Sequence, residues 1–376
     1  MEITKIVITG GPCAGKTTAM SWIQHHFTRM GYTVLFIPET ATELITGGVA
    51  PWTCGTNLDY QKCQVRLQLV KEELFEQAAR TMNAEKVLII CDRGFMDNKA
   101  YMNDEEFAAA VASVNGNVVA LRDSYDAVFH LVTAAKGAQE FYTTDNNAAR
   151  YESVEEACAM DDKLIAAWTG HPHLRVIDNS TSFDEKLKKL MNEIISFLGI
   201  ENPIETEKKF LIAYPDLDWL ANNPYCHKID IIQTFLTAPA GEERKVRQRG
   251  EDGHYMCYVT TKIPMDETGL KRIETEHRIS ENEYNRLLGT ADPDKAPLHK
   301  TRYCLTYEHQ YFEVDVYPFW KDRAILEIEL SQDDQQIIFP PQLHVYREIT
   351  GEKEYKSTAL AEMVMRKQKA NAGTEQ

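Results

Sequence analysis

The sequence predicts two folded parts of different class. The first is an α/β domain in which helices cover both faces of a parallel sheet, and the second is an α+β domain built on an antiparallel, eight-stranded, tunnel-like barrel. Length is one observation behind this prediction, because 376 residues, 43% of them hydrophobic, exceed what one ordinary core organises. Pattern is the other: residues 1–198 alternate strand and helix signals, whereas residues 203–365 form short strands of alternating charged and apolar side chains.

The elements of the first half follow one another as strand, helix, strand. Buried strands are predicted at 3–9, 33–37, 86–91, 126–132 and 174–178, and helices at 16–30, 59–82 and 183–198. The stretch "GIENP" (199–203) marks a boundary, which gives a first domain at 1–199 and a second at 200–365. The polar residues 366–376 are expected to form a disordered tail.

Composition narrows the classes of function. A formal net charge of −16 argues against nucleic acid as an obligatory partner. No apolar run approaches the roughly 20 residues needed to cross a bilayer, so no membrane partner is expected. Eight cysteines without a C-x-x-C pair, and the lack of a charged-then-apolar leader, predict a reduced, cytoplasmic protein. The oligomeric state is not indicated.

The motif G-x-x-x-x-G-K-[ST] lies between the first predicted strand and the first predicted helix, which is the context of a phosphate-binding P-loop. Backbone N–H groups of such a loop face phosphate oxygens, Lys16 reaches the β and γ phosphates, and the Thr17 hydroxyl binds Mg²⁺. The alternative is a glycine-rich turn without a ligand. The nucleotide-binding candidates, for ATP or GTP, are Gly10, Gly11, Pro12, Cys13, Ala14, Gly15, Lys16, Thr17 and Thr18.

Polar residues also follow two other strands of this half. Asp92 ends the third strand, at the carboxyl edge of the sheet, where a carboxylate is needed to position a metal ion. Asp92 and Lys16 are the catalytic candidates of this half. Arg93 is expected to touch a substrate or phosphate. Glu39, just after the second strand, is a base or substrate anchor, or else an ordinary helix-capping residue.

The segment 134–153 between the fourth and fifth strands is polar and longer than a normal connection. Such a segment is the usual place for a mobile lid, in which Lys136 and Arg150 close over the phosphates. A solvated helix pair is an equal alternative.

This half resembles the P-loop AAA/ATPase and kinase-like domains grouped with nicotinamide riboside kinase, over residues 1–198. The motifs "GGPCAGKTT", "PETA" and "CDRG", together with the polar segment, carry the resemblance. It implies the fold and nucleotide binding. The acceptor of any phosphoryl group stays open.

In the second half, charges recur at i and i+2 on strand after strand, so that they share one face of each strand. The residues between them, such as Phe312 and Val314, are apolar. The charged sets in chain order are Glu205, Glu207 and Lys209; Arg247 and Arg249; Thr260 and Lys262; Arg272, Glu274 and Glu276; Lys300 and Arg302; Glu313 and Asp315; Glu327 and Glu329. Basic and acidic strands are expected to form opposite walls of one cavity. The alternative is a sheet whose polar face meets water.

The seven sets in this order resemble the triphosphate tunnel metalloenzymes of the CYTH superfamily, over residues 203–365. The resemblance implies that a triphosphate is cradled by Lys209, Arg247, Arg249, Lys262, Arg272, Lys300 and Arg302. It also implies that Mg²⁺ or Mn²⁺ is held by the catalytic carboxylates Glu205, Glu207, Glu327 and Glu329. Glu274, Glu276, Glu313 and Asp315 support the metals or orient water.

The resemblance leaves three functions in play. The first is a metal-dependent hydrolase of tripolyphosphate or of a triphosphorylated organic compound, fused to a P-loop domain with kinase activity on a small molecule, as in similar plant proteins. The second is a class IV adenylyl cyclase-like lyase, and the third a polyphosphate-sensing tunnel that regulates the P-loop domain. Lys356 departs from the family pattern, in which a small polar residue often follows the Tyr, and it either binds phosphate or lies on the surface.

Overall fold

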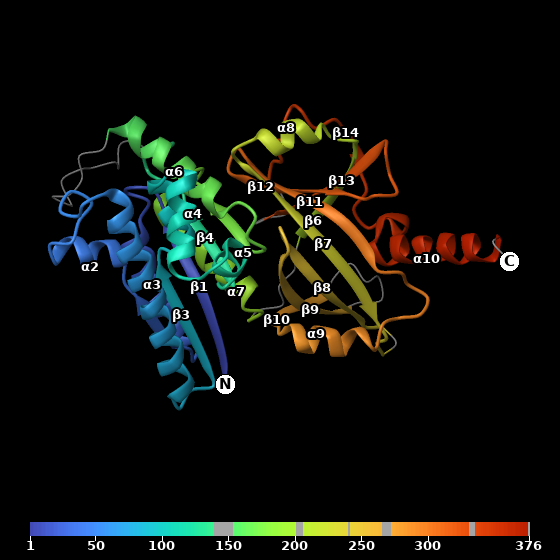
Figure 1. The fold of residues 1–376 in the computed structure, drawn as a ribbon, viewed down its shortest axis with the longest axis horizontal. Coiled ribbons are helices and arrows are strands. Elements are labelled where there is room, and N and C mark those ends of the chain that lie inside the picture. The colour runs from blue at the N-terminus through green and yellow to red at the C-terminus, as the bar shows by residue number, and fades with distance from the viewer. Residues whose placement is uncertain (139–152, 201–205, 240, 265–271, 331–334, 375–376) are drawn as a thin grey trace. The chain divides into compact units, whose positions relative to one another are not determined.

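The computed structural model describes residues 1–138, 153–200, 206–239, 241–264, 272–330 and 335–374. The chain divides into two compact units, Met1–Glu193 and Ile194–Gln376 (Figure 1). None of the helices in the described ranges is long and apolar enough to span a bilayer.

A parallel five-stranded sheet forms the centre of the first unit. Its strands are β1 (Glu2–Gly10), β2 (Thr33–Ile37), β3 (Lys86–Asp92), β4 (Ala127–Leu131) and β5 (Leu174–Ile177), in the order β2-β3-β1-β4-β5. Ile6, Val7 and Ile8 of the central β1 are fully buried. Ile8 lies opposite Asp92 of β3, which brings the carboxyl ends of these strands to one edge of the sheet.

Helices surround this sheet. They are α1 (Lys16–Arg29), α2 (Thr40–Thr46), α3 (Asn57–Thr81), the 3₁₀ helix η1 (Phe95–Tyr101), α4 (Asp104–Ser113), α5 (Val118–Arg122), α6 (Val154–Trp168) and α7 (Phe183–Phe197). The five strands and α1, α3 and α7 confirm the sequence prediction. The other helices were not predicted because most are short, although the capping box of Ser153 and Glu156 signals the start of α6.

The second unit contains a nine-stranded sheet, which confirms the predicted antiparallel α+β class with one strand more than expected. Its strands are β6 (Thr206–Ala213), β7 (Cys226–Leu236), β8 (Glu243–Glu251), β9 (His254–Pro264), β10 (Arg272–Ile279), β11 (Leu298–Tyr307), β12 (Gln310–Val316), β13 (Arg323–Leu330) and β14 (Val345–Glu348). The order is β10-β9-β8-β7-β11-β12-β13-β6-β14. Among the described residues, β10 and β14 are the two edges and do not pair with each other.

An apolar core covers one face of the neighbouring strands β11, β12, β13 and β6. Phe210, Phe312, Val314, Leu326 and Ile328 all belong to it, as the i, i+2 spacing predicts.

Four helical segments complete the second unit: α8 (Leu217–Asn222), α9 (Glu281–Leu288), the 3₁₀ turn η3 (Lys353–Tyr355) and α10 (Ser357–Thr374). Figure 1 shows α9 beside β9, against which it packs. The expectation of a disordered tail from residue 366 was wrong: α10 continues to Thr374, since its Ala, Lys, Gln and Met residues are good helix formers.

Candidate functional site

The P-loop leaves β1 and turns directly into α1. Gly10 has a φ of 151°, and a Cβ there would lie 2.2 Å from the carbonyl oxygen of Leu131. Gly15 has a φ of 91°, and its Cβ would lie 2.5 Å from the ring of Phe183. Both positions therefore require glycine. No side chain caps α1, so the N–H groups of its first turn are available to an anion.

Asp161 of α6 anchors the P-loop from behind. It is fully buried, and its Oδ1 accepts hydrogen bonds from the backbone N–H of Gly11 at 3.0 Å and of Thr133 at 3.1 Å. The Nε2 of His130 lies 3.0 Å from the same oxygen. Burial alone would raise the pKa of Asp161, but its contacts with His130 and Lys136 outweigh that effect and lower it. Asp161 thus remains an ionised acceptor that holds the loop amide in place.

Four ionisable groups lie at the carboxyl edge of the sheet. Glu39 is the N-cap residue of α2 but forms no capping bond, and its Oε1 instead accepts a hydrogen bond of 2.5 Å from Arg93 Nε. Burial alone would raise the pKa of Glu39, but the attraction of Arg93 and Lys16 outweighs it and lowers this pKa to about 2. Burial also lowers the pKa of Lys16, as does the nearby Arg93. Glu39 is therefore ionised throughout the physiological range.

Asp92 is the remaining member of this group. Burial raises its pKa, against the attraction of Lys16. Its Oδ1 is buried and has no hydrogen-bond partner among the described residues. A buried carboxylate oxygen without a partner is costly, so the site fits a cation that completes its contacts.

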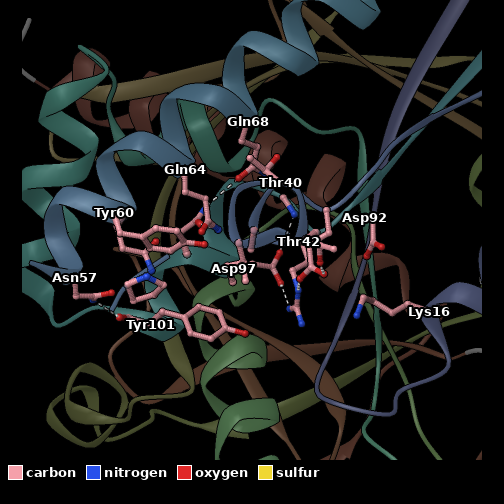
Figure 2. Close-up of a pocket in the computed structure, with 18 of the residues that line it drawn as sticks. Lys16, Thr40, Thr42, Asn57, Tyr60, Gln64, Gln68, Asp92, Asp97 and Tyr101 are labelled. Atoms are coloured by element: carbon pink, nitrogen blue, oxygen red, sulfur yellow. Dashed lines mark hydrogen bonds and ion pairs between the residues drawn. The ribbon is translucent and has the colours of Figure 1, made fainter. Parts of the chain in front are cut away.

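These groups line one end of a cavity of about 430 Å³. Figure 2 shows Lys16 and Asp92 on one side of it and Asn57, Tyr60 and Tyr101 on the other. One end of the cavity is therefore charged and next to the P-loop, while the other is neutral and polar.

The residues expected to close over the phosphates lie elsewhere or outside the described ranges. Lys136 Nζ pairs with Asp161 at 3.1 Å and with Asp162 at 2.5 Å. Arg150 and the segment 139–152 lie outside the described residues, so the lid stays a prediction.

In the second unit, charged side chains of four neighbouring strands form one network. Arg302 is its centre: its Nε donates to Asp315 at 2.6 Å, its Nη2 donates to Glu327 at 2.8 Å, and its Nη1 donates to Glu313. Lys209 bonds to Glu327 and lies 3.2 Å from Glu207. Lys300 also donates to Asp315, which is fully buried.

The pKa values of this network depend on its pairing. Burial alone would raise the pKa of Glu327, but Lys209, Lys300 and Arg302 outweigh it, and the pKa falls well below its usual range. Burial likewise opposes a charge on Lys209, yet Glu207 and Glu327 raise the pKa of this ammonium. Burial raises the pKa of Glu313, against the attraction of Arg302.

The expectation of opposite basic and acidic walls was wrong. The basic β11 pairs directly with the acidic β12, with Arg302 opposite Asp315, and Glu327 of β13 lies opposite Lys209 of β6. Neighbouring strands of opposite charge compensate each other, whereas separate walls would leave like charges adjacent and buried.

The strands from β7 to β10 continue the same face. Arg249 lies opposite Ile231, which in turn lies opposite Lys300. Arg247 pairs with Glu276, and its Nε is buried without a hydrogen-bond partner in the described part of the chain. Lys262 lies opposite the backbone of Glu274. Glu205 and the side chains of Arg272 and Glu274 are outside the described residues.

The metal-binding carboxylates stay a prediction, because Glu205 and the side chain of Glu274 lie outside the described residues. Glu207 and Glu329 lie directly opposite each other on β6 and β13, where two carboxylates repel. A divalent cation between these hard oxygen donors would remove the repulsion, so this pair fits Mg²⁺ or Mn²⁺. The described residues contain no group of three or more His, Cys, Asp or Glu arranged to hold a metal ion. In this structure Glu276, Glu313, Asp315 and Glu327 pair with basic side chains instead.

The charged face also ends in apolar contacts. Leu211 and Ile325, two residues beyond Lys209 and Glu327 along their strands, pack with Leu360 of α10. The face on which the charged side chains lie is therefore apolar at this end. Lys356 directly precedes α10 and is half-buried.

Sequence reasoning missed several residues of the site in the first unit. Asp161 gave no signal, because only the tertiary structure brings α6 behind the P-loop. By contrast, Gln61, Gln64, Gln68 and Glu72 recur at helical spacing and are all buried along α3. A buried polar stripe on a helix is a signal that the sequence does contain.

Two comparisons of the sequence with known proteins each match a part of the chain. A family model described as "AAA domain" matches residues 5–186. An inorganic triphosphatase from Nitrosomonas europaea is 32% identical over 162 residues, which span 42% of this chain and 96% of that protein.

Two solved structures are also similar. One is a crystal structure of an inorganic triphosphatase (28% identity, 42% of this chain, 94% of that chain, TM-score 0.29). The other is deoxyadenosine kinase from M. mycoides with bound dATP (18% identity, 51% of this chain, 98% of that chain, TM-score 0.34). With TM-scores below 0.5, these two likenesses define neither fold nor function by themselves.

Fold and site together define a two-unit protein that joins an α/β unit with a P-loop motif to an antiparallel sheet with a densely charged face. The chain belongs to the family of the Nitrosomonas europaea inorganic triphosphatase, nearly all of which it covers.

Proposed function

We propose that the second unit hydrolyses triphosphates with the help of a divalent cation, and that the first unit binds ATP or GTP and transfers its γ-phosphoryl group to a small molecule. The observation that carries this proposal is the charged face centred on Arg302. It is supported by the similarity to an inorganic triphosphatase, 96% of whose length is matched by this chain. We assign the matched 162 residues to the second unit because the AAA-domain match takes up residues 5–186.

In the second unit, basic side chains bind the phosphates and carboxylates orient the attacking water. Arg247, whose buried Nε has no hydrogen-bond partner among the described residues, is suited to an anionic oxygen. Lys209, Arg249, Lys262, Arg272, Lys300 and Arg302 supply further positive charge to the same face. Glu313, whose pKa is raised, is suited to take a proton from the attacking water. The water oxygen bonds to the terminal phosphorus, the phosphoanhydride bond breaks, and the remaining chain leaves as pyrophosphate when the substrate is tripolyphosphate.

The metal would be held by Glu207 and Glu329 together with Glu205. Mg²⁺ or Mn²⁺ in that place would supply Lewis-acid stabilisation of the phosphate charge.

In the first unit, the P-loop amides and Lys16 bind the β and γ phosphates, and Thr17 and Asp92 would hold Mg²⁺. Glu39 is ionised and lies beside the cavity, so it is placed to accept a hydrogen bond from the acceptor hydroxyl. The hydroxyl oxygen attacks the γ phosphorus, the β–γ anhydride bond breaks, the nucleoside diphosphate leaves, and the hydroxyl proton passes through Glu39 to solvent. Positioning contributes most of the catalysis in such a transfer.

Phosphate release from tripolyphosphate, with Mg²⁺ and then with Mn²⁺, tests this assignment. We expect release to survive Lys16→Ala and to disappear with Glu207→Ala, because the two substitutions lie in different units. Glu354→Ala, at an exposed position, serves as the matched control and keeps full activity.

Other outcomes would support other functions. Cyclic AMP and pyrophosphate from ATP, lost in Glu207→Ala, would identify a lyase. Binding of tripolyphosphate without turnover, with nucleotide turnover lost only in Lys16→Ala, would identify a sensor and overturn the hydrolase proposal.

A further inference from the structure

Unsatisfied polar atoms gather around the cavity of the first unit. The hydroxyl of Tyr60, Oε1 of Gln61 and Oδ1 of Asp92 are buried and lack hydrogen-bond partners among the described residues, and all three residues line the cavity. Tyr60 and Gln61 are 2% and 3% exposed. Since a buried polar group without a partner is costly, these atoms indicate that a polar ligand completes them.

A chain of buried hydrogen bonds sets the polarity of the neutral end. It starts at the carboxylate of Glu72, which can only accept and receives bonds from Lys5 Nζ at 3.2 Å and the hydroxyl of Tyr125 at 2.8 Å. Gln68 must therefore donate from its Nε2 to Oε1 of Glu72, at 3.2 Å, and its Oε1 points away from Glu72.

The orientation of Gln68 in turn fixes which end of each following side-chain amide donates and which end accepts. The oxygen of Gln68 accepts from Asn98 Nδ2 at 3.0 Å, and Asn98 also donates to the carbonyl oxygen of Phe95 at 2.8 Å. The oxygen of Asn98 then accepts from Gln64 Nε2 at 2.6 Å. Gln64 is the last member, and its Oε1 is left as an acceptor at the cavity, into which Figure 2 shows the residue facing.

The neutral end thus presents a defined hydrogen-bonding pattern. Gln64 and Gln61 offer carbonyl oxygens that accept. Tyr60 offers a hydroxyl that donates, since burial and the nearby Glu39 raise its pKa to about 12 and keep it protonated. The aromatic rings of Tyr60 and Tyr101 also line this end.

We propose that this end is the acceptor subsite, and that it takes a neutral, hydroxyl-bearing compound of nucleoside size with an N–H group beside a carbonyl, as in an imide or cyclic amide. The N–H would donate to Gln64 and the carbonyl would accept from Tyr60. The inference rests on the phosphoryl transfer proposed for the first unit.

Charge and size restrict the ligand further. The side chains at this end are uncharged: Asn57, Tyr60, Gln61, Gln64, Gln68, Asn98 and Tyr101. An acidic or cationic group buried among them would lose its hydration without gaining a counter-charge. The 430 Å³ volume suits a single small molecule.

Matched pairs of probes test the N–H group. Uridine and inosine carry the N–H beside a carbonyl, whereas 3-methyluridine and 1-methylinosine differ by a methyl group on that nitrogen. Calorimetric titration of the full chain, saturated with a non-hydrolysable ATP analogue and Mg²⁺, should show each parent binding about tenfold or more tighter than its methylated partner.

Gln64→Leu should abolish this difference by removing the acceptor oxygen. Gln77→Leu, on the exposed part of the same helix, should preserve it. Thermal unfolding of both variants shows whether the fold is retained, and Gln64→Met, which keeps the length of the side chain, replaces Gln64→Leu if that variant unfolds.

The outcomes separate this inference from the function on which it rests. Parent-selective binding without phosphoryl transfer would support the subsite and overturn the kinase proposal. Transfer to glycerate or choline, with neither uridine nor inosine bound, would support a kinase and overturn the subsite. Equal binding of parent and methylated probes, or no binding of either, would also overturn the proposed subsite.

Discussion

Glu327 is the residue on which the charge balance of the second unit depends most. It is 7% exposed and contacts both Lys209 and Arg302. Glu327→Gln removes the negative charge but keeps the shape, so Lys209 and the buried Arg302 each lose one of their carboxylate partners. We expect a loss of about 3–5 kcal/mol in the free energy of unfolding, measured by urea denaturation at pH 7. Glu354→Gln, at an exposed position, should change it by less than about 0.5 kcal/mol.

The pH dependence of that loss follows from the lowered pKa of Glu327. A carboxyl whose pKa is lower in the folded state stabilises the fold above its unfolded pKa of 4.5, and this contribution disappears as the pH falls toward the folded value. The difference between the wild type and Glu327→Gln should therefore be constant from pH 7 to about pH 5 and shrink below about pH 4.5. A difference that grows on acidification would contradict the assignment.

At the scale of elements, the P-loop depends on the close approach of β1 to β4. Gly10→Ala would place a Cβ 2.2 Å from the carbonyl oxygen of Leu131, which is part of the sheet and cannot move aside. We expect a cost of about 3 kcal/mol or more and weaker ATP binding. Gly31→Ala is the matched control, because Gly31 has a φ of 87° with nothing within 4 Å, and it should cost about 1–2 kcal/mol with ATP binding unchanged.

Among the described side chains of α10, those of its first turns pack against the second unit. Leu360 is 2% exposed and packs with Leu211 and Ile325, so Leu360→Ala should cost about 2–5 kcal/mol. Residues 366–370 are exposed, and the ion pairs of Arg366 and Lys369 lie on the surface. Removal of residues 366–376 should therefore cost at most about 1 kcal/mol, measured by thermal unfolding. A larger loss would mean that the end of α10 contributes contacts of its own.

At the scale of the whole molecule, each unit has its own sheet and its own core. Units with separate cores usually unfold separately. We expect scanning calorimetry to resolve two transitions, of which Gly10→Ala lowers only one and Leu360→Ala only the other. A single transition that both substitutions lower equally would show that the units unfold together.

The success of sequence reasoning differed between strands and side-chain contacts. The strand at Lys86–Asp92 and the apolar residues Phe312 and Val314 were predicted because burial leaves a periodic pattern along the chain. The pairing of Arg302 with Asp315 was mispredicted, because strand order is set by turns and long-range packing rather than by the charge pattern of one strand.

By itself, the sequence determined the class of each unit, the P-loop motif at the end of β1, and the shared face of the charged side chains that meet around Arg302, since these follow from local spacing and from the need for glycine at tight turns. Tertiary structure alone decided that basic and acidic strands are neighbours. It also decided that Asp161 holds the P-loop, and that Glu72 orients the amide of Gln64 through two other side chains. These contacts join residues far apart in the chain, and their hydrogen-bond polarity depends on geometry that no local pattern contains.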